Sequence, residues 1–352
     1  MMNSRNWFVV LLMLVAPLAP ADTLPRTASG HPDLSGFYDS GTLTPLNRPR
    51  EFGDKQFMTK EEAASIMARA ATSLAAANAP SDPERGAPVV GGDGNQALGA
   101  GGVGGYNAFW VDPGSEVVAI DGKIRTSIIY DPPNGRQPAM TRVGRMRMAD
   151  NFSSFGHRND GTASWLDYDG PGPFDNPESL ALAERCLLGF SVGPPMLPGL
   201  YNNFKRIVQT DTHVMILLEM VHDARIIRLN DEHLPAGMTR WFGDSVGHWE
   251  GDTLVVDTRN FKSATGLGGA GEELHLIERF TLQADGNLLY DFTVDDPSAW
   301  TSPWSGAYVW QKSTDKVFEY ACHEGNYSMG NILRGARLLE EEELARRAAG
   351  AE

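Results

Sequence analysis

The sequence lacks the short motifs that mark most cofactor and nucleophile sites. It has only two cysteines, and it contains no CxxCH haem motif and no paired CxxC zinc spacing. It also has no HExxH or HxH pair, and its Gly-rich stretch at 78–105 lacks the Gly-Lys-Ser/Thr ending of a phosphate loop. The GxSxG serine pattern occurs as GFSVG at 189–193 and as GDSVG at 243–247, and the second of these is interpreted as a turn. Any other site in this protein must be assembled from residues that lie far apart in the sequence.

An excess of basic residues is also lacking. The chain has 45 acidic and 30 basic residues, which gives a net charge of −15. An acidic surface repels nucleic acid and anionic lipid, so we expect neither as a partner. We expect a neutral or cationic small molecule instead, unless a local basic pocket overrides the field of the whole protein. The oligomeric state is left open.

Long apolar runs are absent except at the start of the chain. Residues 7–15 are apolar, Arg5 precedes them, and Ala19-Pro20-Ala21 offers small residues for a signal peptidase. A membrane span needs roughly 20 apolar residues, and this run stops at Pro17. The pattern predicts a signal peptide over residues 1–21, cleaved after Ala21, and a periplasmic or secreted protein. An uncleaved anchor is the alternative.

The two cysteines are interpreted through this export. Thiols in an oxidising compartment usually pair, and two cysteines allow one intramolecular connectivity. The sequence therefore predicts a disulfide between Cys186 and Cys322. The alternative is two separate buried thiols.

The rest of the chain predicts a mainly β protein. An N-terminal extended segment, 22–105, contains one helix at 60–77 that begins at a capping box formed by Thr59 and Glu62. Residues 106–337 follow as an antiparallel β domain with long irregular loops, and residues 338–352 as a charged helix or tail. A further helix is expected near 177–187. Hairpins without intervening helices favour an antiparallel barrel or sandwich. The expected strands are 34–38, 116–120, 123–130, 204–209, 213–221, 225–229, 245–250, 253–258, 274–283, 288–295, 307–312 and 317–322.

One hairpin can be placed in register. A three-residue turn ending at Gly286 puts His275 opposite Asp295 and Arg279 opposite Asp291. One face of this hairpin is then apolar with Glu278 as its only charge, and the other is polar. We hypothesise that the polar face lines a pocket and carries an active site; the alternative is that it faces water.

Residue roles follow from this hypothesis. His275, oriented by Asp295, or His323 would act as a general base, and Arg279 would stabilise a developing oxyanion. Glu278 would be an acid of raised pKa, the partner of an arginine, or a residue at the rim of the sheet. The candidate catalytic residues are His275, Arg279, His323, Asp291, Asp295 and Glu278. The candidate substrate-binding residues are His222, His248, Trp241, Glu324 and Tyr290.

No cofactor is predicted from the sequence. A metal ion held by histidines from several strands, with Glu219 or Glu324, is the alternative. His233 and the other loop histidines are interpreted as ordinary surface residues.

Three stretches carry a resemblance to a group of secreted bacterial proteins of unassigned function. They are DLSG at 33–36, GDSVGHWEGDTLVVDT at 243–258 and YACHEGN at 320–326. The resemblance covers residues 31 to about 337, and it implies a common fold and export. The hairpin sequence WEGDTLVV at 249–256 is also similar to hairpins of lipocalin-like barrels, which is a resemblance of fold only.

The sequence therefore predicts an exported enzyme that uses His and acid groups for proton transfer on a small neutral organic molecule, as a lyase, isomerase or hydrolase. The alternative is a non-catalytic periplasmic protein that binds an apolar ligand. The two are distinguished by the pocket: converging His, Arg and acid groups favour the enzyme, and a uniformly apolar lining favours the binder.

Overall fold

A computed structural model describes residues 24–80, 84, 86, 110–151, 154, 161–189 and 193–350. The predicted signal peptide and most of the Gly-rich stretch lie outside the described residues.

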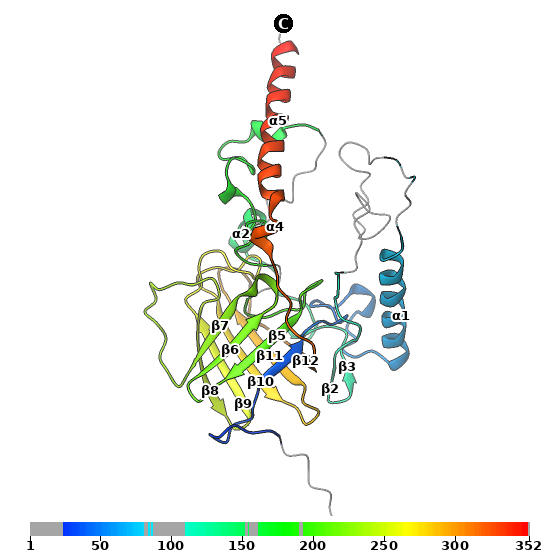
Figure 1. The fold of residues 1–352 in the computed structure, drawn as a ribbon, viewed down its shortest axis with the longest axis vertical. Helices are drawn as coiled ribbons and strands as arrows, with labels where there is room; N and C mark the ends of the chain where they lie inside the picture. Colours follow the sequence, from blue (N-terminus) through cyan, green and yellow to red (C-terminus); the bar gives the residue numbers. More distant parts are fainter. Residues whose placement is uncertain are drawn as a thin grey trace, which may run out of the picture.

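A closed barrel of nine strands forms the centre of the protein (Figure 1). Around the barrel the strands are β1 (Gly36–Asp39), β5 (Phe204–Gln209), β6 (His213–Leu218), β7 (Ala224–Leu229), β8 (Asp244–Glu250), β9 (Thr253–Arg259), β10 (His275–Leu282), β11 (Leu288–Asp295) and β12 (Trp304–Ser313). The pairing of β1 with β12 closes the sheet, and β4 (Ile129–Asp131) also pairs with β12. The neighbouring barrel strands pair antiparallel, apart from β7 and β8, which pair parallel. The prediction of a mainly β protein is confirmed, as a barrel and not a sandwich.

The predicted hairpin register is also confirmed. His275 lies opposite Asp295 and Arg279 lies opposite Asp291 in the β10–β11 pair. Gly286 has a φ of 85°, and the N–H of Gln283 donates to the carbonyl of Asn287 over 2.8 Å. A positive φ at this turn position favours glycine, which explains why the short turn fixes the register.

The interior of the barrel is a packed aromatic core. Its largest buried side chains include Tyr38, Phe280, Tyr290, Phe292, Trp304, Tyr308 and Trp310. Neighbouring rings lie edge to face or tilted, as in the Tyr290–Tyr308 pair, whose centroids are 5.7 Å apart. Because aromatic side chains fill the interior, the barrel is a rigid support for the loops that connect its strands.

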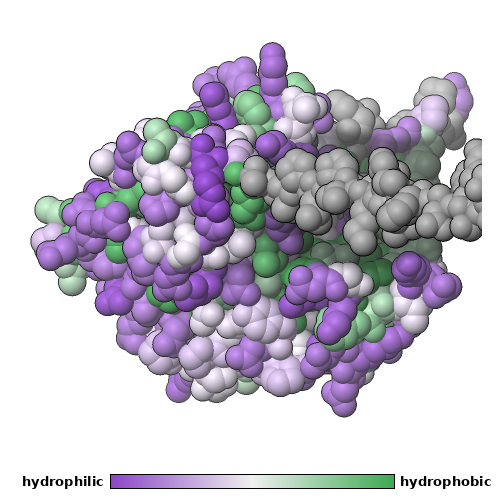
Figure 2. Space-filling view, turned by 90° about the horizontal axis from the view of Figure 1, so that it is seen from below, coloured by the Kyte–Doolittle hydropathy of each residue, from purple (hydrophilic) through white to green (hydrophobic). Residues whose placement is uncertain are grey.

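The prediction that the polar face of β10 lines a pocket is wrong. Leu276, Glu278 and Phe280 are buried inside the barrel, whereas the side chains of His275 and Arg279 are 35% and 43% exposed on its outer surface. Closing the sheet places the more apolar face inside, because burying it removes the larger apolar area from water. Seen from the lower end of Figure 1, hydrophilic residues prevail on the surface, with small apolar areas between them (Figure 2).

Two long helices lie outside the barrel (Figure 1). The predicted helix α1 (Lys60–Ala77) is present with its capping box at Thr59. The longest helix is C-terminal: α5 (Tyr327–Gly350) starts about ten residues before the predicted boundary at 337. Indole Nε1 of Trp165 donates to Oε1 of Glu340 over 2.7 Å, which fixes α5 against residues 163–174.

Several local predictions are wrong. Residues 317–321 are irregular and lead into α4 (Cys322–Gly325), so the last predicted strand does not form. The predicted helix near 177–187 is reduced to a 3-10 turn, η4 (Pro177–Ser179), which forms no side-chain hydrogen bond at its N-cap within the described residues. The hairpin expected from strands 116–120 and 123–130 is shorter, with β2 (Ala119–Ile120) and β3 (Lys123–Ile124) as its strands. The helix α2 (Arg142–Asn151) was not predicted. The remaining elements are η1 (Arg50–Phe52), η3 (Ser164–Asp167) and η5 (Met220–His222).

The predicted disulfide between Cys186 and Cys322 is confirmed, with Cα atoms 5.8 Å apart. It joins the irregular segment after η4 to α4. In the described part of the chain, no helix combines the length and the apolar character that a membrane span requires.

Candidate functional site

Several connecting segments meet at one end of the barrel. In the sheet register, Thr258 near the end of β9 lies opposite Leu276 of β10, Leu276 lies opposite Val294 of β11, and Val294 lies opposite Trp304 at the start of β12. β4 pairs at this same end of β12, and β1, which pairs with the other end of β12 antiparallel, runs toward it. The segments that follow β1, β4 and β9 gather over this mouth of the barrel, with residues 181–189 and Leu197 among them.

These segments enclose a cavity of about 270 Å³. We call it the apolar cavity. The described residues that line it are Leu46, Gln137, Met140, Met148, Asn151, Ala181, Leu182, Ala183, Leu188, Gly189, Leu197, Thr265, Gly266, Leu267 and Gly268. Among these described lining residues none is charged, and the polar groups are the side chains of Gln137, Asn151 and Thr265. Ligand pockets that are mainly apolar with a few polar groups have this composition.

The walls of the apolar cavity are anchored in the barrel core. Leu188 and Leu267 belong to that core, and Leu46, Met140 and Leu182 pack against it. The loop between β9 and β10 is held by Thr265, whose hydroxyl donates to the carbonyl of Leu267 over 3.0 Å. The cavity is thus preformed, apart from the adaptable methionine side chains.

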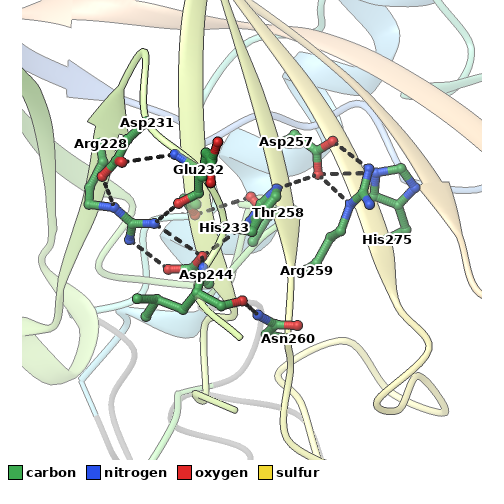
Figure 3. Close-up of polar contacts among 12 residues, drawn as sticks. Arg228, Asp231, Glu232, His233, Asp244, Asp257, Thr258, Arg259, Asn260 and His275 are labelled. Carbon is green, nitrogen blue, oxygen red and sulfur yellow. Dashed lines mark hydrogen bonds and ion pairs between the residues drawn. The ribbon is translucent and has the colours of Figure 1, made fainter. Parts of the chain in front are cut away.

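A second candidate site lies on the outer face of the barrel (Figure 3). Nδ1 of His233 is 3.1 Å from Oδ2 of Asp244, and Nε2 of His233 is 3.2 Å from Oδ1 of Asp257. The same Oδ1 lies 3.1 Å from Nε2 of His275. Asp244, His233, Asp257 and His275 thus form a continuous alternation of acids and imidazoles, which we call the His–Asp chain.

Arginines set the charge of both carboxylates in the His–Asp chain. Burial alone would raise the pKa of Asp244, but hydrogen bonds from Arg228, Leu234 N–H and His233 outweigh it and lower the pKa to about 2. Burial also opposes ionisation of Asp257, and the hydrogen bonds and charges of Arg259 and His275 hold the pKa of that carboxyl below its usual value. Both carboxylates are therefore ionised at neutral pH and can orient an imidazole.

The structure gives His275 and Arg279 partners other than the predicted ones. His275 bonds Asp257 on β9 instead of Asp295 across the hairpin, and Nη1 of Arg279 lies 2.7 Å from Oε2 of Glu250. Asp291 instead accepts from the hydroxyl of Tyr130 over 3.3 Å. Burial raises the pKa of Asp291. Side chains on the outer face of a sheet reach both neighbouring strands, and register alone does not select between them.

Glu278 and Tyr290 lie inside the barrel. Glu278 is an ion-pair partner of Arg225, and the hydroxyl of Tyr290 donates to its Oε1 over 2.7 Å. Of the alternatives considered for Glu278, the structure shows the arginine partner. Burial next to Glu278 raises the pKa of Tyr290 well above its usual value. These groups are arranged as a closed structural network.

The other predicted residues are spread over the surface. Nδ1 of His222 is 3.2 Å from the carbonyl of Tyr320, His248 pairs with Glu250, and the ring of Trp241 packs under Lys262. His323 and Glu324 are exposed on α4. Among the contacts of the described residues, none joins His323 or Glu324 to His275.

The described residues give no evidence for the alternative of a metal site. They contain no group of three or more His, Cys, Asp or Glu residues arranged to hold a metal ion.

Sequence reasoning missed His233, Asp244 and Asp257. Alternation along the predicted strand 253–258 places Asp257 on the same face as Thr253 and Val255, so this position could have been proposed from the sequence. His233 lies in the crossover between the parallel strands β7 and β8, and nothing in its local sequence indicates that this loop folds back on the barrel.

No protein-family model matches the chain, and a search of curated proteins finds no match either.

Proposed function

We propose that the protein binds a small, mainly apolar molecule in the apolar cavity. The observation that carries the proposal is the lining: among the described residues it is built from Leu, Met, Ala and Gly side chains with three neutral polar groups. The His, Arg and acid groups that were expected at the pocket lie on the outer face of the barrel. By the criterion set from the sequence, this favours a binding protein over an enzyme.

The size of the apolar cavity limits the ligand. A volume of about 270 Å³ is near the lower end of ligand pockets, which span roughly 300–1,000 Å³. The neutral side chains of Gln137, Asn151 and Thr265 offer hydrogen bonds to one polar group of the ligand. If the predicted signal peptide directs export, the ligand is met outside the cytoplasm.

The proposal is tested by filling the cavity. Ala181 is buried and lines it, so Ala181→Leu places three more carbon atoms into the ligand volume. Calorimetric titration with small alcohols, ketones and hydrocarbons of graded length should show saturable binding to the wild type and its loss in Ala181→Leu. The control is Ala71→Leu, the same change at an exposed position of α1, which should bind as the wild type does. Equal binding by both variants would reject the cavity as the site.

Proton-transfer catalysis is the second candidate, and the His–Asp chain is the observation that favours it. Nε2 of His275 faces Asp257, and within the described residues Nδ1 of His275 has no partner, so it is free to act on a substrate. Untargeted mass spectrometry of a metabolite mixture incubated with the protein tests this. A product that disappears with His275→Ala and persists with Ala181→Leu would identify an enzyme.

A further inference from the structure

Three arginines line one cavity next to the apolar cavity. Arg48, Arg50 and Arg136 surround a space of about 580 Å³ together with Trp300. Gln137 and Met140 line both this space and the apolar cavity, so the two adjoin. Three like charges in one pocket are unusual in a chain with a net charge of −15, and they create a local positive field within an acidic protein.

Arg48 is held rigidly in this pocket. It is 3% exposed, and its Nε donates to the hydroxyl of Thr126 over 3.0 Å. Its backbone N–H donates to the carbonyl of Gly135 over 2.7 Å, and a Cβ at Gly135 would lie 2.7 Å from Nη2 of Arg48. The guanidinium therefore lies close to the turn at Gly135, where a side chain on that residue would collide with it.

Two residues that line the pocket carry buried donors that find no acceptor among the described residues. Nη1 of Arg48 and Nε1 of Trp300 are both buried, and neither has a hydrogen-bond partner within the described part of the chain. A buried cation and a buried indole N–H both require an acceptor, because neither can accept. The nearby amide oxygens each already accept one hydrogen bond: Oε1 of Gln137 from Nδ2 of Asn47 over 3.2 Å, and Oδ1 of Asn47 from the backbone N–H of Gln137 over 2.7 Å.

The other two arginines are also available. Arg50 is exposed and Arg136 is partly exposed, and no ion pair to either side chain is formed by a described residue. Arg48 likewise forms no ion pair with a described carboxylate. A planar guanidinium fork matches the two oxygens of a carboxylate, and charged hydrogen bonds of this kind are stronger than neutral ones.

We propose that Arg48, Arg50, Arg136 and Trp300 bind the carboxylate of a ligand whose apolar part occupies the adjoining apolar cavity. This inference rests on the proposed binding function and names its ligand class: a small apolar molecule that carries one carboxylate. It revises the expectation of a neutral ligand, through the local basic pocket that the sequence analysis left open. The anionic group supplies acceptors to the buried donors, and the tail replaces water at the Leu and Met side chains.

The experiment compares hexanoate with hexan-1-ol by calorimetric titration of the full chain. Two charged hydrogen bonds predict that the wild type binds hexanoate at least about tenfold more tightly. Arg50→Gln/Arg136→Gln, at the two more exposed positions, should remove most of this preference and leave hexan-1-ol binding unchanged. Arg48→Met should remove the rest. The matched control is Arg69→Gln on α1, which removes one positive charge away from this pocket and should keep the preference.

Each other result has a distinct meaning. Equal affinities for hexanoate and hexan-1-ol would overturn the carboxylate site and leave the proposed function standing. A preference that survived in all arginine variants would also overturn it. Inorganic phosphate that bound more tightly than hexanoate would overturn the assignment to a carboxylate. Failure of both probes to bind would overturn this inference together with the proposed function.

Discussion

Nη1 of Arg225 lies 2.9 Å from Oε1 of Glu278 in the interior of the barrel, where both side chains are buried. Nε of Arg225 donates to the hydroxyl of Ser245, and the hydroxyl of Tyr290 donates to Glu278. The N–H of Met196 in turn donates to Tyr290 over 3.0 Å. This network joins strands β7, β8, β10 and β11 to the segment that leads into the apolar cavity.

The first prediction concerns this buried pair. Glu278→Ala leaves the guanidinium of Arg225 buried without its carboxylate, and breaking such a pair costs about 3–5 kcal/mol of unfolding free energy. Urea unfolding at neutral pH measures the loss. Arg279→Ala, the next residue of the same strand, breaks a solvent-exposed pair with Glu250 and should cost little. Similar losses for both variants would show that the interior pair does not stabilise the barrel.

The sequence predicts contacts between residues that are close along the chain better than contacts between residues that are far apart along it. The register of β10 and β11 follows from a short turn with Gly286, since local backbone chemistry sets it. That Glu278 needs an arginine follows from its place on an apolar face. The sequence does not show that this arginine is Arg225, because Arg225 of β7 comes near Glu278 of β10 only when the whole barrel closes.

The same limit explains the misplaced site. Alternation along β10 separates two faces, but which of them faces inward is decided by the other barrel strands. Trp304, Tyr308 and Trp310 fill the interior from β12, and that leaves His275 and Arg279 outside. The apolar cavity could not be predicted at all, because its residues come from irregular segments without periodicity, such as 181–189 and 265–268.

The second prediction concerns the disulfide. Cys186 and Cys322 close a loop of 136 residues, so replacing both by Ala should lower the unfolding free energy by about 2–5 kcal/mol. Ala181 and Ala183 of the apolar cavity lie close to Cys186 in the chain, so ligand affinity should fall as well. Reduced wild-type protein should match the double variant. Two reactive thiols in denatured, unreduced protein would show that the bridge is absent.

The third prediction concerns Lys205, which is buried at the wall of the barrel. Its ammonium donates to the carbonyl of Asn203 over 3.2 Å and to the hydroxyl of Ser40, and it lies 5.0 Å from the ring centroid of Trp310. Burial lowers the pKa of Lys205 to about 8, against the opposing charges of Asp39 and Glu219. In the unfolded chain the pKa returns to about 10.4.

Between these two pKa values the unfolded state of Lys205 holds a proton that the folded state has lost, so stability rises with pH across this window. The unfolding free energy of the wild type relative to Lys205→Met should therefore increase from pH 7.5 to pH 10, by about 2 kcal/mol. Urea unfolding at several pH values measures the difference, and titrations common to both proteins cancel. A difference that stayed constant or fell over this range would show that Lys205 is not desolvated in the folded protein.

The last prediction concerns Asp244, which anchors the His–Asp chain. Oδ1 of Asp244 lies 2.7 Å from Nη1 of Arg228, and its Oδ2 accepts from the N–H of Leu234 over 2.9 Å. These bonds hold the crossover loop between β7 and β8 on the barrel and position His233 (Figure 3). Removing the charge of Asp244 should therefore loosen the loop as well as destabilise the fold.

The sign of the pH dependence follows from the lowered pKa of Asp244, about 2 in the folded protein. A carboxyl whose pKa is depressed on folding contributes stability above its unfolded pKa of about 3.9, and this contribution is lost as the pH falls through the folded pKa. Asp244→Asn should thus cost about 1–2 kcal/mol at pH 6, and the difference from the wild type should shrink between pH 4 and pH 2.

Thermal unfolding followed by circular dichroism measures this difference, and amide hydrogen exchange at Leu234 reports the loop directly. Asp231→Asn is the matched control, because Asp231 pairs with the same Arg228 but is 53% exposed. The control should leave both the pH profile and the exchange rate close to those of the wild type. If Asp244→Asn instead gave a pH-independent loss with unchanged exchange at Leu234, the carboxylate would not hold the loop, and His233 would have to be positioned by Asp257 alone.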